Sequence, residues 1–424
     1  MTRHNLDLLF WQSRPYLTQI RYVADCKGQS PWPMLGWSLI RALHTVPYDV
    51  RYKSLIGEQA LNSLVGISGP TGAGKTISAN LVEEHLIFPD NNPEKIFTKT
   101  WAGRTPPGSG EAMPDFYVEA APLDKDEEEA VFFSHHRDRL SETHVWKHPN
   151  HAAVFFFDEG GKLESLNSRQ GSTVTEYMKE GWSGSEFGRT LASGRGIILP
   201  KNSYRFACVI NTQPKRSGAL FTDEAIAGGL QGRFLWFDVT ADINRHLVTY
   251  EDVDPVYIPH IDWSGVKHIR ALASMNLAHQ QHHWNALDGH VTDTESHILL
   301  TKAKVAVGLA VLDGRVELND EDWQLAEVII QHTNETRSTI QEVLKEEYRR
   351  SVISDGKRAA VKVGFSEEER NRVRVETVAA ALLRWREREG KTKGGKSALS
   401  KLQRESYEEA DEFLRLHPEW RPPE

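Results

Sequence analysis

The sequence predicts an α/β protein built around a parallel β-sheet. Short apolar runs at residues 61–67, 153–157 and 234–239 indicate buried strands. Each run has the length of a strand, and stretches with the apolar spacing of helices lie between them. Parallel strands need crossover connections, usually helices, so this alternation favours a parallel sheet over an antiparallel one.

Length and composition bound the protein class. The 424 residues allow two or three domains, and 39% hydrophobic residues suffice for a sizeable core. No apolar run approaches the roughly 18 residues of a membrane span, and the N-terminal apolar patch is too interrupted for a signal peptide. The two cysteines, Cys26 and Cys208, lie far apart. They fit a reducing compartment rather than a disulfide framework, so we expect a cytoplasmic protein that does not associate with a membrane.

The segments divide the chain into four expected parts. Prolines at 15, 31, 33 and 47 interrupt a first part that is mainly helical. Residues 196–210 read as a hairpin that leads into another core strand. From about residue 260 the pattern becomes helical, and Asn319 or Asp320 can cap the helix that follows. We expect an N-terminal helical segment at 1–60, an ATPase-like core at 61–260, a helical lid at 261–350, and a linker with a small basic helical or winged-helix domain at 351–424.

The strongest motif is the run GPTGAGKT, which directly follows the strand at 61–67. Ile77, Leu81, Val82 and Leu86 then fall on one face of a helix. A strand, a glycine-rich loop and a helix in this order are the setting of a phosphate-binding P-loop. We expect ATP and Mg²⁺ as cofactors, with the phosphates bound by Gly69, Pro70, Thr71, Gly72, Ala73, Gly74, Lys75 and Thr76.

Within this loop each residue type has a chemical reason. Gly69, Gly72 and Gly74 let the backbone bend so that its N–H groups surround phosphate oxygens. Lys75 reaches the terminal phosphates, and the Thr76 hydroxyl contributes a ligand to Mg²⁺.

An acidic pair, Asp158-Glu159, ends the apolar strand VFFF. An acid at the end of a core strand can hold Mg²⁺, and a neighbouring glutamate can orient or deprotonate the attacking water. We therefore assign Asp158 to the metal and Glu159 to general-base catalysis.

Two further residues complete the expected catalytic set. Asn211 ends the segment YRFACVIN and is expected to contact the attacking water or the γ-phosphate, with Gln213 as the next candidate. Arg233 precedes the strand at 234–239, where an arginine can neutralise transition-state charge in a neighbouring subunit.

These motifs in this order resemble the AAA+ ATPases, and among them the MCM-like helicases. In that family a hairpin precedes the sensor strand and carries a basic residue that contacts DNA in a central pore. The resemblance implies that Arg195, near the tip, and Lys201, after it, bind DNA, that Asn211 is the sensor, and that Arg233 is the arginine finger of a hexameric ring. No sensor-2 arginine is evident; the lid segment offers Lys302 and Lys304.

A second resemblance spans most of the chain. The segments FWQSRPYLTQIRYVA, GSGEA, DEGGKL and GLQGRFLW are similar to helicase-like ATPases of phage, plasmid and integrative-element replication, which are often attached to primase–polymerase domains. It implies a role in replicating a mobile element. No primase domain is visible, so a separate primase or polymerase is the implied partner.

Weaker signals leave alternatives open. The net charge of −8 excludes bulk polycationic binding, but residues 384–404 form a basic run that either contacts nucleic acid or is a solvated helix and linker. His279 and His283 have the spacing of zinc ligands on a helix, although a polar helix face fits better. Among the tryptophans, Trp182 and Trp385 are candidates for stacking on bases.

Together the sequence predicts an oligomeric, ATP-hydrolysing DNA motor, a replicative helicase or helicase-like protein acting on single-stranded or forked DNA. The alternative is an ATP-dependent switch or loader that remodels a protein partner in replication initiation or phage defence without translocating on DNA. A DNA-packaging or conjugation ATPase fits the helical lid and basic C-terminus less well.

Overall fold

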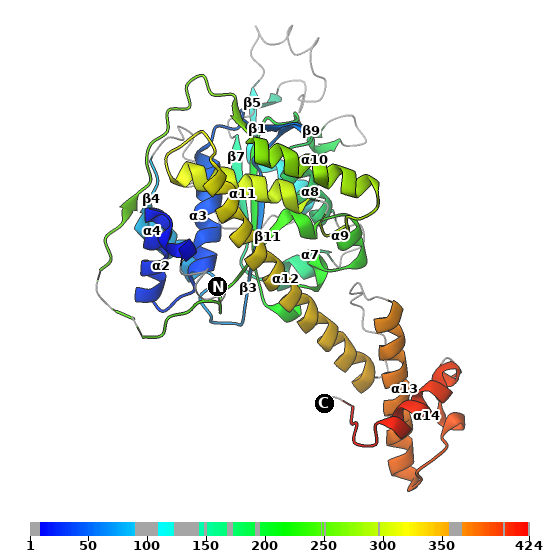
Figure 1. Cartoon of the computed structure of the whole chain (residues 1–424). Helices are drawn as coiled ribbons and strands as arrows, with labels where there is room; N and C mark the ends of the chain where they lie inside the picture. The colour runs from blue at the N-terminus through cyan, green and yellow to red at the C-terminus, as the bar shows by residue number, and fades with distance from the viewer. Residues whose placement is uncertain are drawn as a thin grey trace.

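A four-stranded sheet, all parallel, forms the centre of the computed structural model (Figure 1). The strand order is β11–β3–β10–β7, which confirms the predicted mixed α/β architecture and parallel sheet. The strands are β3 (Ser63–Ser68), β7 (Ala152–Phe157), β10 (Arg205–Thr212) and β11 (Phe234–Asp238). The structure describes residues 9–89, 109–122, 144–147, 151–167, 173–190, 196–246, 248–249, 252–295, 297–355, 367–401 and 403–422.

Both faces of this sheet are buried, which explains why its strands are almost wholly apolar. Side chains alternate between faces along a strand, so each strand contributes to two hydrophobic cores. In β10, Ala207 and Val209 join one core, and Phe206, Cys208 and Ile210 join the other. Close packing between strands also needs glycine at one point: a Cβ on Gly66 would lie 2.3 Å from the Trp236 ring of the neighbouring strand.

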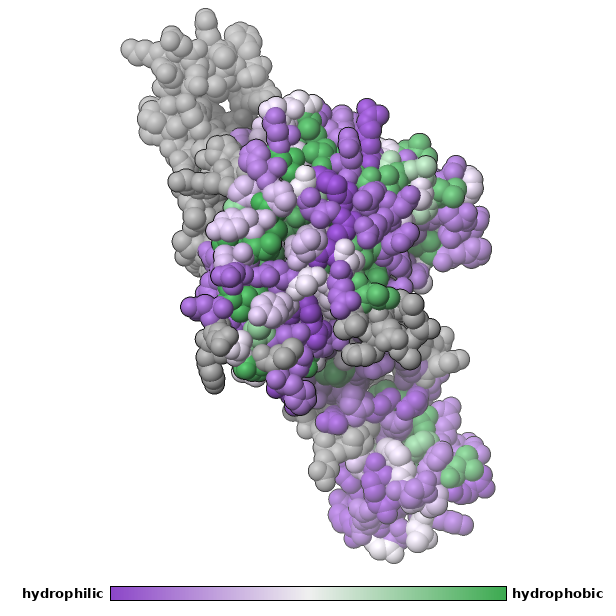
Figure 2. Space-filling view, turned by 60° about the vertical axis from the view of Figure 1, so that its left-hand side comes forward, coloured by the Kyte–Doolittle hydropathy of each residue, from purple (hydrophilic) through white to green (hydrophobic). Residues whose placement is uncertain are grey.

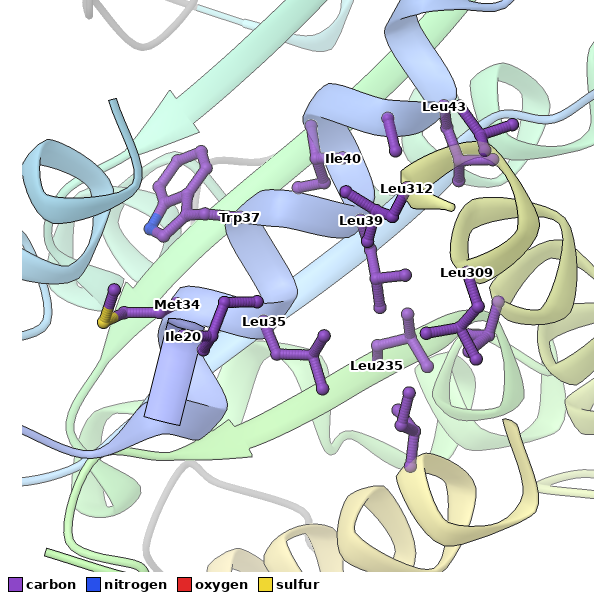
Figure 3. Close-up of a cluster of buried hydrophobic side chains, with 14 of the residues drawn as sticks. Ile20, Met34, Leu35, Trp37, Leu39, Ile40, Leu43, Leu235, Leu309 and Leu312 are labelled. Atoms are coloured by element: carbon purple, nitrogen blue, oxygen red, sulfur yellow. The ribbon is translucent and has the colours of Figure 1, made fainter. Parts of the chain in front are cut away.

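The helices that cover the first face include α2 (Pro15–Cys26), α3 (Pro31–Thr45), α4 (Ile77–His85) and α11 (Ile298–Leu312). Figure 3 shows α3 in this core, where Leu39 and Leu43 lie beside Leu309 and Leu312 of α11. Two of the predicted proline breaks are the first residues of α2 and α3, where the missing N–H costs no helical hydrogen bond.

The second face carries α7 (Gly160–Asn167), α8 (Val174–Ser183) and α9 (Asp223–Ala227), on the opposite side of the sheet from α3 in Figure 1. Short 3₁₀ turns connect and extend these helices: η1 (Gly110–Ala112), η2 (Pro114–Tyr117), η4 (Pro214–Arg216), η5 (Gly218–Leu220) and η6 (Gln231–Arg233).

The prediction that residues 1–60 are mainly helical is wrong for residues 51–59. Here β1 (Arg51–Ser54) pairs antiparallel with β2 (Gly57–Gln59) and parallel with β13 (His268–Arg270). The pairing of β1 with β13 joins residues more than two hundred positions apart, so local sequence does not reveal that part of the sheet. Two smaller pairs join β4 (Leu86–Ile87) with β12 (Val256–Tyr257), and β5 (Glu119–Pro122) with β6 (His144–Lys147).

The predicted hairpin before β10 also differs from the observed one in its bounds. β9 (Gly196–Leu199) pairs antiparallel with β8 (Phe187–Thr190), so the hairpin begins before residue 196, where the predicted range starts, and it leads into the core strand β10 as predicted. Strand β10 has β3 on one edge and β7 on the other, so neither edge is open to β9. Residues 200–204 therefore form a turn between the hairpin and the sheet.

The predicted helical part contains α10 (Ala273–Leu287), α11 and α12 (Asp320–Asp355). Asn319 and Asp322 cap α12 reciprocally, because each side-chain carboxamide or carboxylate oxygen accepts the backbone N–H of the other residue at 2.9 Å. This confirms Asn319 as the cap. α11 is buried against α3, and α12 packs along β11, so these helices share the cores of the sheet. Their role as a lid stays a prediction.

The C-terminal region forms a small helical unit with its own hydrophobic cluster. It contains α13 (Glu367–Glu389), η7 (Lys396–Ala398), η8 (Gln403–Ser406) and α14 (Tyr407–Leu416), and its described residues include no strand, which favours the helical alternative over the winged helix. It lies beyond the end of α12 (Figure 1) and shows a mostly hydrophilic face in Figure 2. None of the helices in the described part of the chain is long and apolar enough to cross a membrane.

Candidate functional site

A cleft of about 450 Å³ opens at the edge of the sheet where the parallel strands end. It brings together three segments that the sequence analysis singled out separately: the glycine-rich loop, the acidic pair and the polar end of β10. Ligand sites in open parallel sheets lie at this edge. The cleft is lined by Thr71, Gly72, Gly74, Lys75, Thr76, Ile77, Asp158, Glu159, Gly160, Gly161, Asn211, Thr212, Gln213 and Arg216.

The loop at 69–76 connects β3 to α4 as predicted. Gly72 and Gly74 adopt φ angles of +76° and +89°, a region that side chains with a Cβ rarely enter. Close contacts add a second requirement, because a Cβ on Gly74 would lie 1.8 Å from Gln29 Oε1 and one on Gly69 2.1 Å from Val239 Cγ2. The positive φ angles therefore favour glycine at positions 72 and 74, and the contact with Val239 favours it at position 69.

Lys75 lies across its own loop. Its Nζ donates hydrogen bonds to the carbonyl oxygens of Gly69 at 2.9 Å and Pro70 at 2.6 Å. Partial burial lowers the pKa of Lys75, and the nearby Asp158 carboxylate opposes that change. The ammonium group is thus held at the mouth of the loop, beside the acid of the neighbouring segment.

Thr76, Asp158 and Asn211 meet in the centre of the cleft. The Thr76 hydroxyl donates to Asp158 Oδ1 at 2.8 Å, and Asn211 Nδ2 donates to the same oxygen at 3.0 Å. Asn211 is fully buried, whereas Asp158 is exposed to the cleft. The residues come from three elements: the loop before α4, the end of β7 and the end of β10.

This group fits a magnesium ion by its donor chemistry. Carboxylate and hydroxyl oxygens are the hard ligands that Mg²⁺ prefers, and neighbouring ligands of an octahedral Mg²⁺ with ~2.1 Å bonds lie ~3 Å apart. The Thr76 and Asp158 oxygens have nearly this separation. In addition, Asn211 Oδ1 is buried without a hydrogen-bond partner among the described residues. A polar group near the bound ion or its water would satisfy it.

Glu159 and Gln213 also line the cleft, as the sequence predicted for residues near the reaction. The Glu159 side chain is exposed beside Asp158. Gln213 has a structural part as well, because its carbonyl oxygen accepts the Arg216 N–H at 2.8 Å and the Ser217 hydroxyl at 3.1 Å. These bonds define the turn that follows β10.

Arg216 is a cleft residue that the sequence analysis missed. The signal was present, since this arginine closes the segment NTQPKR directly after the predicted sensor strand. It went unrecognised because the direction of a side chain after a proline turn depends on how the turn packs.

Arg233 does not line the cleft of its own chain. Its Nη1 donates to the Gly228 carbonyl oxygen at 2.8 Å, and its guanidinium lies 5.2 Å from the centre of the Trp182 ring. Partial burial lowers its pKa to about 10, with Glu176 opposing that change. A role toward a neighbouring subunit stays a prediction.

The two lysines offered for a sensor-2 role are used elsewhere. Lys304 is buried and donates to the carbonyl oxygens of Asn62 at 2.7 Å and Trp182 at 3.0 Å, and burial holds its pKa well below the usual value. Lys302 pairs with Glu327 at 2.6 Å. Neither lines the cleft, so this interpretation is wrong.

Two weaker candidates are also corrected. Trp182 is only 2% exposed, with Lys304 Nζ 3.5 Å from its ring centre, so it has no free face for a base. His279 is buried against the Tyr52 hydroxyl at 3.0 Å, and burial lowers its pKa to about 4, so it is not part of a polar helix face. No cluster of three or more potential metal ligands (His, Cys, Asp or Glu) occurs among the described residues.

The two predicted DNA-binding residues lie apart from the cleft. Lys201 is exposed in the turn before β10, whereas the cleft lies at the opposite end of that strand. Eight residues of strand at ~3.3 Å each separate the two ends by roughly 25 Å. Arg195 lies outside the described residues.

No protein-family model matches the chain, and a search of curated proteins finds no match. The chemistry of the cleft therefore carries the functional argument. Its parts are a glycine loop with a lysine, a hydroxyl in contact with a carboxylate, a buried carboxamide on that carboxylate, and an exposed glutamate.

Proposed function

We propose that this protein is a Mg²⁺-dependent P-loop ATPase with an AAA+-like core. The observation that carries the proposal is the contact of Thr76 with Asp158, made beside a glycine-rich loop that holds Lys75. A phosphate-binding loop and a metal-binding acid have separate uses in many proteins. Their meeting in one cleft, after the two strands that flank β10, is the arrangement that nucleotide hydrolysis requires.

The position of β10 supports the AAA+-like assignment. This strand lies between the strand that leads into the loop and the strand that ends in the acidic pair. Its last residues therefore reach the centre of the cleft, where Asn211 fixes the Asp158 carboxylate. A polar residue at the end of this strand is what the resemblance to the AAA+ ATPases implies.

Each residue then has a defined part in the reaction. Bound ATP with Mg²⁺ supplies the phosphoryl group and the charge that neutralises it. The loop N–H groups and Lys75 hold the β- and γ-phosphates, and Thr76 with Asp158 holds the metal directly or through water. Glu159 orients the attacking water and takes its proton, while Asn211 keeps Asp158 in place.

We further propose that the protein is an oligomeric DNA motor that acts as a ring on single-stranded or forked DNA. In this ring, Arg233 acts on the nucleotide of the next subunit. Lys201 supports it, since this lysine is exposed at the sheet edge opposite the cleft, beside the β8–β9 hairpin. A replicative helicase of a mobile element, working with a separate primase or polymerase, is the form that the family resemblance implies.

ATP hydrolysis by the purified protein tests the first step. We expect Mg²⁺-dependent hydrolysis that falls at least about 100-fold in Lys75→Ala, because the lysine contacts the transferred phosphate. Lys267→Ala, which removes only an exposed ion pair with Asp49, is the matched control and keeps the wild-type rate. Equal rates in both variants would overturn the ATPase assignment.

DNA-dependent hydrolysis tests the motor. Forked and single-stranded DNA are expected to stimulate the wild-type ATPase, and Lys201→Ala and Arg195→Ala are expected to lose the stimulation while basal hydrolysis remains. ATP-controlled oligomerisation without DNA stimulation or strand separation would instead favour a switch or loader.

A further inference from the structure

Arg216 is placed at the cleft by a short, well-defined turn. It is the last residue of η4, which follows β10 after Gln213. The Thr212 and Ser217 hydroxyls lie 3.1 Å apart across this turn, and the Ser217 hydroxyl also bonds to the Gln213 carbonyl oxygen. The backbone that carries Arg216 is therefore braced against the end of β10, where Asn211 contacts Asp158.

Two consecutive glycines bring this turn close to the start of α7. A Cβ on Gly160 would lie 2.3 Å from Thr212 Oγ1, and a Cβ on Gly161 would lie 3.2 Å from Arg216 Nη1. The guanidinium thus passes directly over the backbone that follows Asp158 and Glu159. A side chain at position 160 would clash with Thr212, and one at position 161 would crowd the guanidinium, so the two glycines let this turn lie close to the start of α7.

The contacts of the cationic side chains in the cleft indicate a role for Arg216. Lys75 and Arg216 are the two cationic side chains among the described residues that line it. The Lys75 ammonium is bonded to loop carbonyls, whereas no acceptor for the Arg216 guanidinium occurs among the described residues. The neighbouring Lys215 points elsewhere, because it pairs with Glu347 of α12 at 2.5 Å.

An exposed arginine held over a phosphate site is suited to one class of ligand. The planar guanidinium presents N–H donors in a geometry that matches phosphate oxygens. Its hydrogen bonds are strongest where negative charge accumulates on those oxygens. Lys302 and Lys304 of the helical part form other contacts, so they add no cation to Lys75 and Arg216 in the cleft.

We propose that Arg216 contacts the terminal phosphate of the nucleotide bound by its own subunit, and so distinguishes ATP from ADP and stabilises the transition state. The inference rests on the proposed ATPase function. It differs from the part assigned to Arg233, because Arg216 lines the cleft that belongs to the same chain.

Nucleotide affinity and turnover of Arg216→Ala test this proposal in the full-length protein. We expect kcat to fall about 10²–10³-fold, the range found when one donor to developing charge is removed. ATP affinity falls with it, whereas ADP affinity, measured with a fluorescent ADP analogue, stays unchanged. Arg216→Lys recovers part of the loss, and Lys215→Ala, on the same turn, behaves as wild type.

The outcomes separate the two proposals. Wild-type protein that neither binds nor hydrolyses ATP would refute the ATPase itself. Hydrolysis that depends on Lys75 but is unchanged in Arg216→Ala would refute only the role of Arg216. Equal loss of ATP and ADP affinity would likewise refute it, since the γ-phosphate would not be the contact.

Mixed subunits distinguish action within a chain from action on a neighbour. In a mixture of Arg216→Ala and Lys75→Ala proteins, each subunit lacks one of the two residues. If Arg216 acts on the nucleotide of its own subunit, every site is therefore defective and activity stays low. Recovery of hydrolysis in the mixture would contradict the proposal, because an intact Arg216 of a Lys75→Ala subunit would then serve its neighbour.

Discussion

At the scale of single residues, the cleft depends on one buried carboxamide. Asn211 has no exposure, and its Nδ2 donates to Asp158 Oδ1 at 3.0 Å and lies 3.4 Å from the Thr76 hydroxyl. It therefore orients the proposed metal-binding carboxylate from behind. Removing a partner of this kind typically lowers metal affinity or activity by about 10–100-fold.

Asn211→Ala is expected to lower the affinity for Mg²⁺ rather than the affinity of the loop for the nucleotide. The Mg²⁺ concentration for half-maximal hydrolysis should rise about 10–100-fold. Asn211→Asp should lower turnover further, because it adds a second negative charge about 3 Å from Asp158. Magnesium titrations of ATPase activity measure both effects. A wild-type Mg²⁺ requirement in Asn211→Ala would show that Asp158 is held by other contacts.

At the scale of elements, α3 is the helix that joins the sheet to α11. His44 near its end lies 2.9 Å from the Ile40 carbonyl oxygen and 3.4 Å from that of Ala153 on β7. Burial, with Arg205 nearby, lowers the pKa of His44 to about 4. The interface between α3 and the sheet therefore contains an imidazole that stays neutral when the chain is folded.

This histidine predicts acid sensitivity. Below about pH 6.5 the unfolded chain binds a proton at His44, whereas the folded chain does not until the pH nears 4, so stability falls as the pH decreases through this window. The His44 contribution to that loss is about 2 kcal/mol between about pH 7 and about pH 5. Urea unfolding at the two pH values should show a smaller difference for His44→Gln, and no change for the exposed His260→Gln. An unaltered pH dependence in His44→Gln would contradict the assignment.

At the scale of the whole molecule, α12 connects two hydrophobic units. Its first part packs along β11, and its far part contacts α13 of the C-terminal unit (Figure 1). The contacts between α12 and α13 include ion pairs of Lys345 with Glu369 at 2.7 Å and of Arg349 with Glu376 at 3.2 Å. Partly exposed pairs of this kind contribute about 1 kcal/mol or less each. The C-terminal unit instead has a core of its own.

A chain that ends at Asp355 should therefore keep the fold of the sheet domain. We expect its melting temperature to lie within about 4 °C of the main transition of the full chain, and basal ATP hydrolysis to persist. Calorimetry of both chains is the measurement. Aggregation of the shortened chain, or loss of its cooperative transition, would show that the C-terminal unit completes the main core.

Features set by short-range interactions were predictable, and features set by long-range interactions were not. The strands at 61–67, 153–157 and 234–239, and the cap at Asn319, were predictable because strand burial and capping are visible within a few residues. The pairing of β1 with β13 was not, since a short exposed strand depends on a distant partner. The predicted hairpin range, 196–210, omits β8, because the apolar run at 196–199 carries no mark of which strand it pairs with.

By itself the sequence determined the composition of the candidate site: the glycine loop with Lys75 and Thr76, the acidic pair, and Asn211. These positions are readable because strand ends in a parallel sheet converge on one edge, whatever the details of packing. Only the tertiary structure decided which side chains reach the cleft. It placed Arg216 there and buried Lys304 beside Trp182. The reason is physical, since the direction of a long cationic side chain is set by the turns, glycines and carbonyls around it and not by its neighbours in sequence.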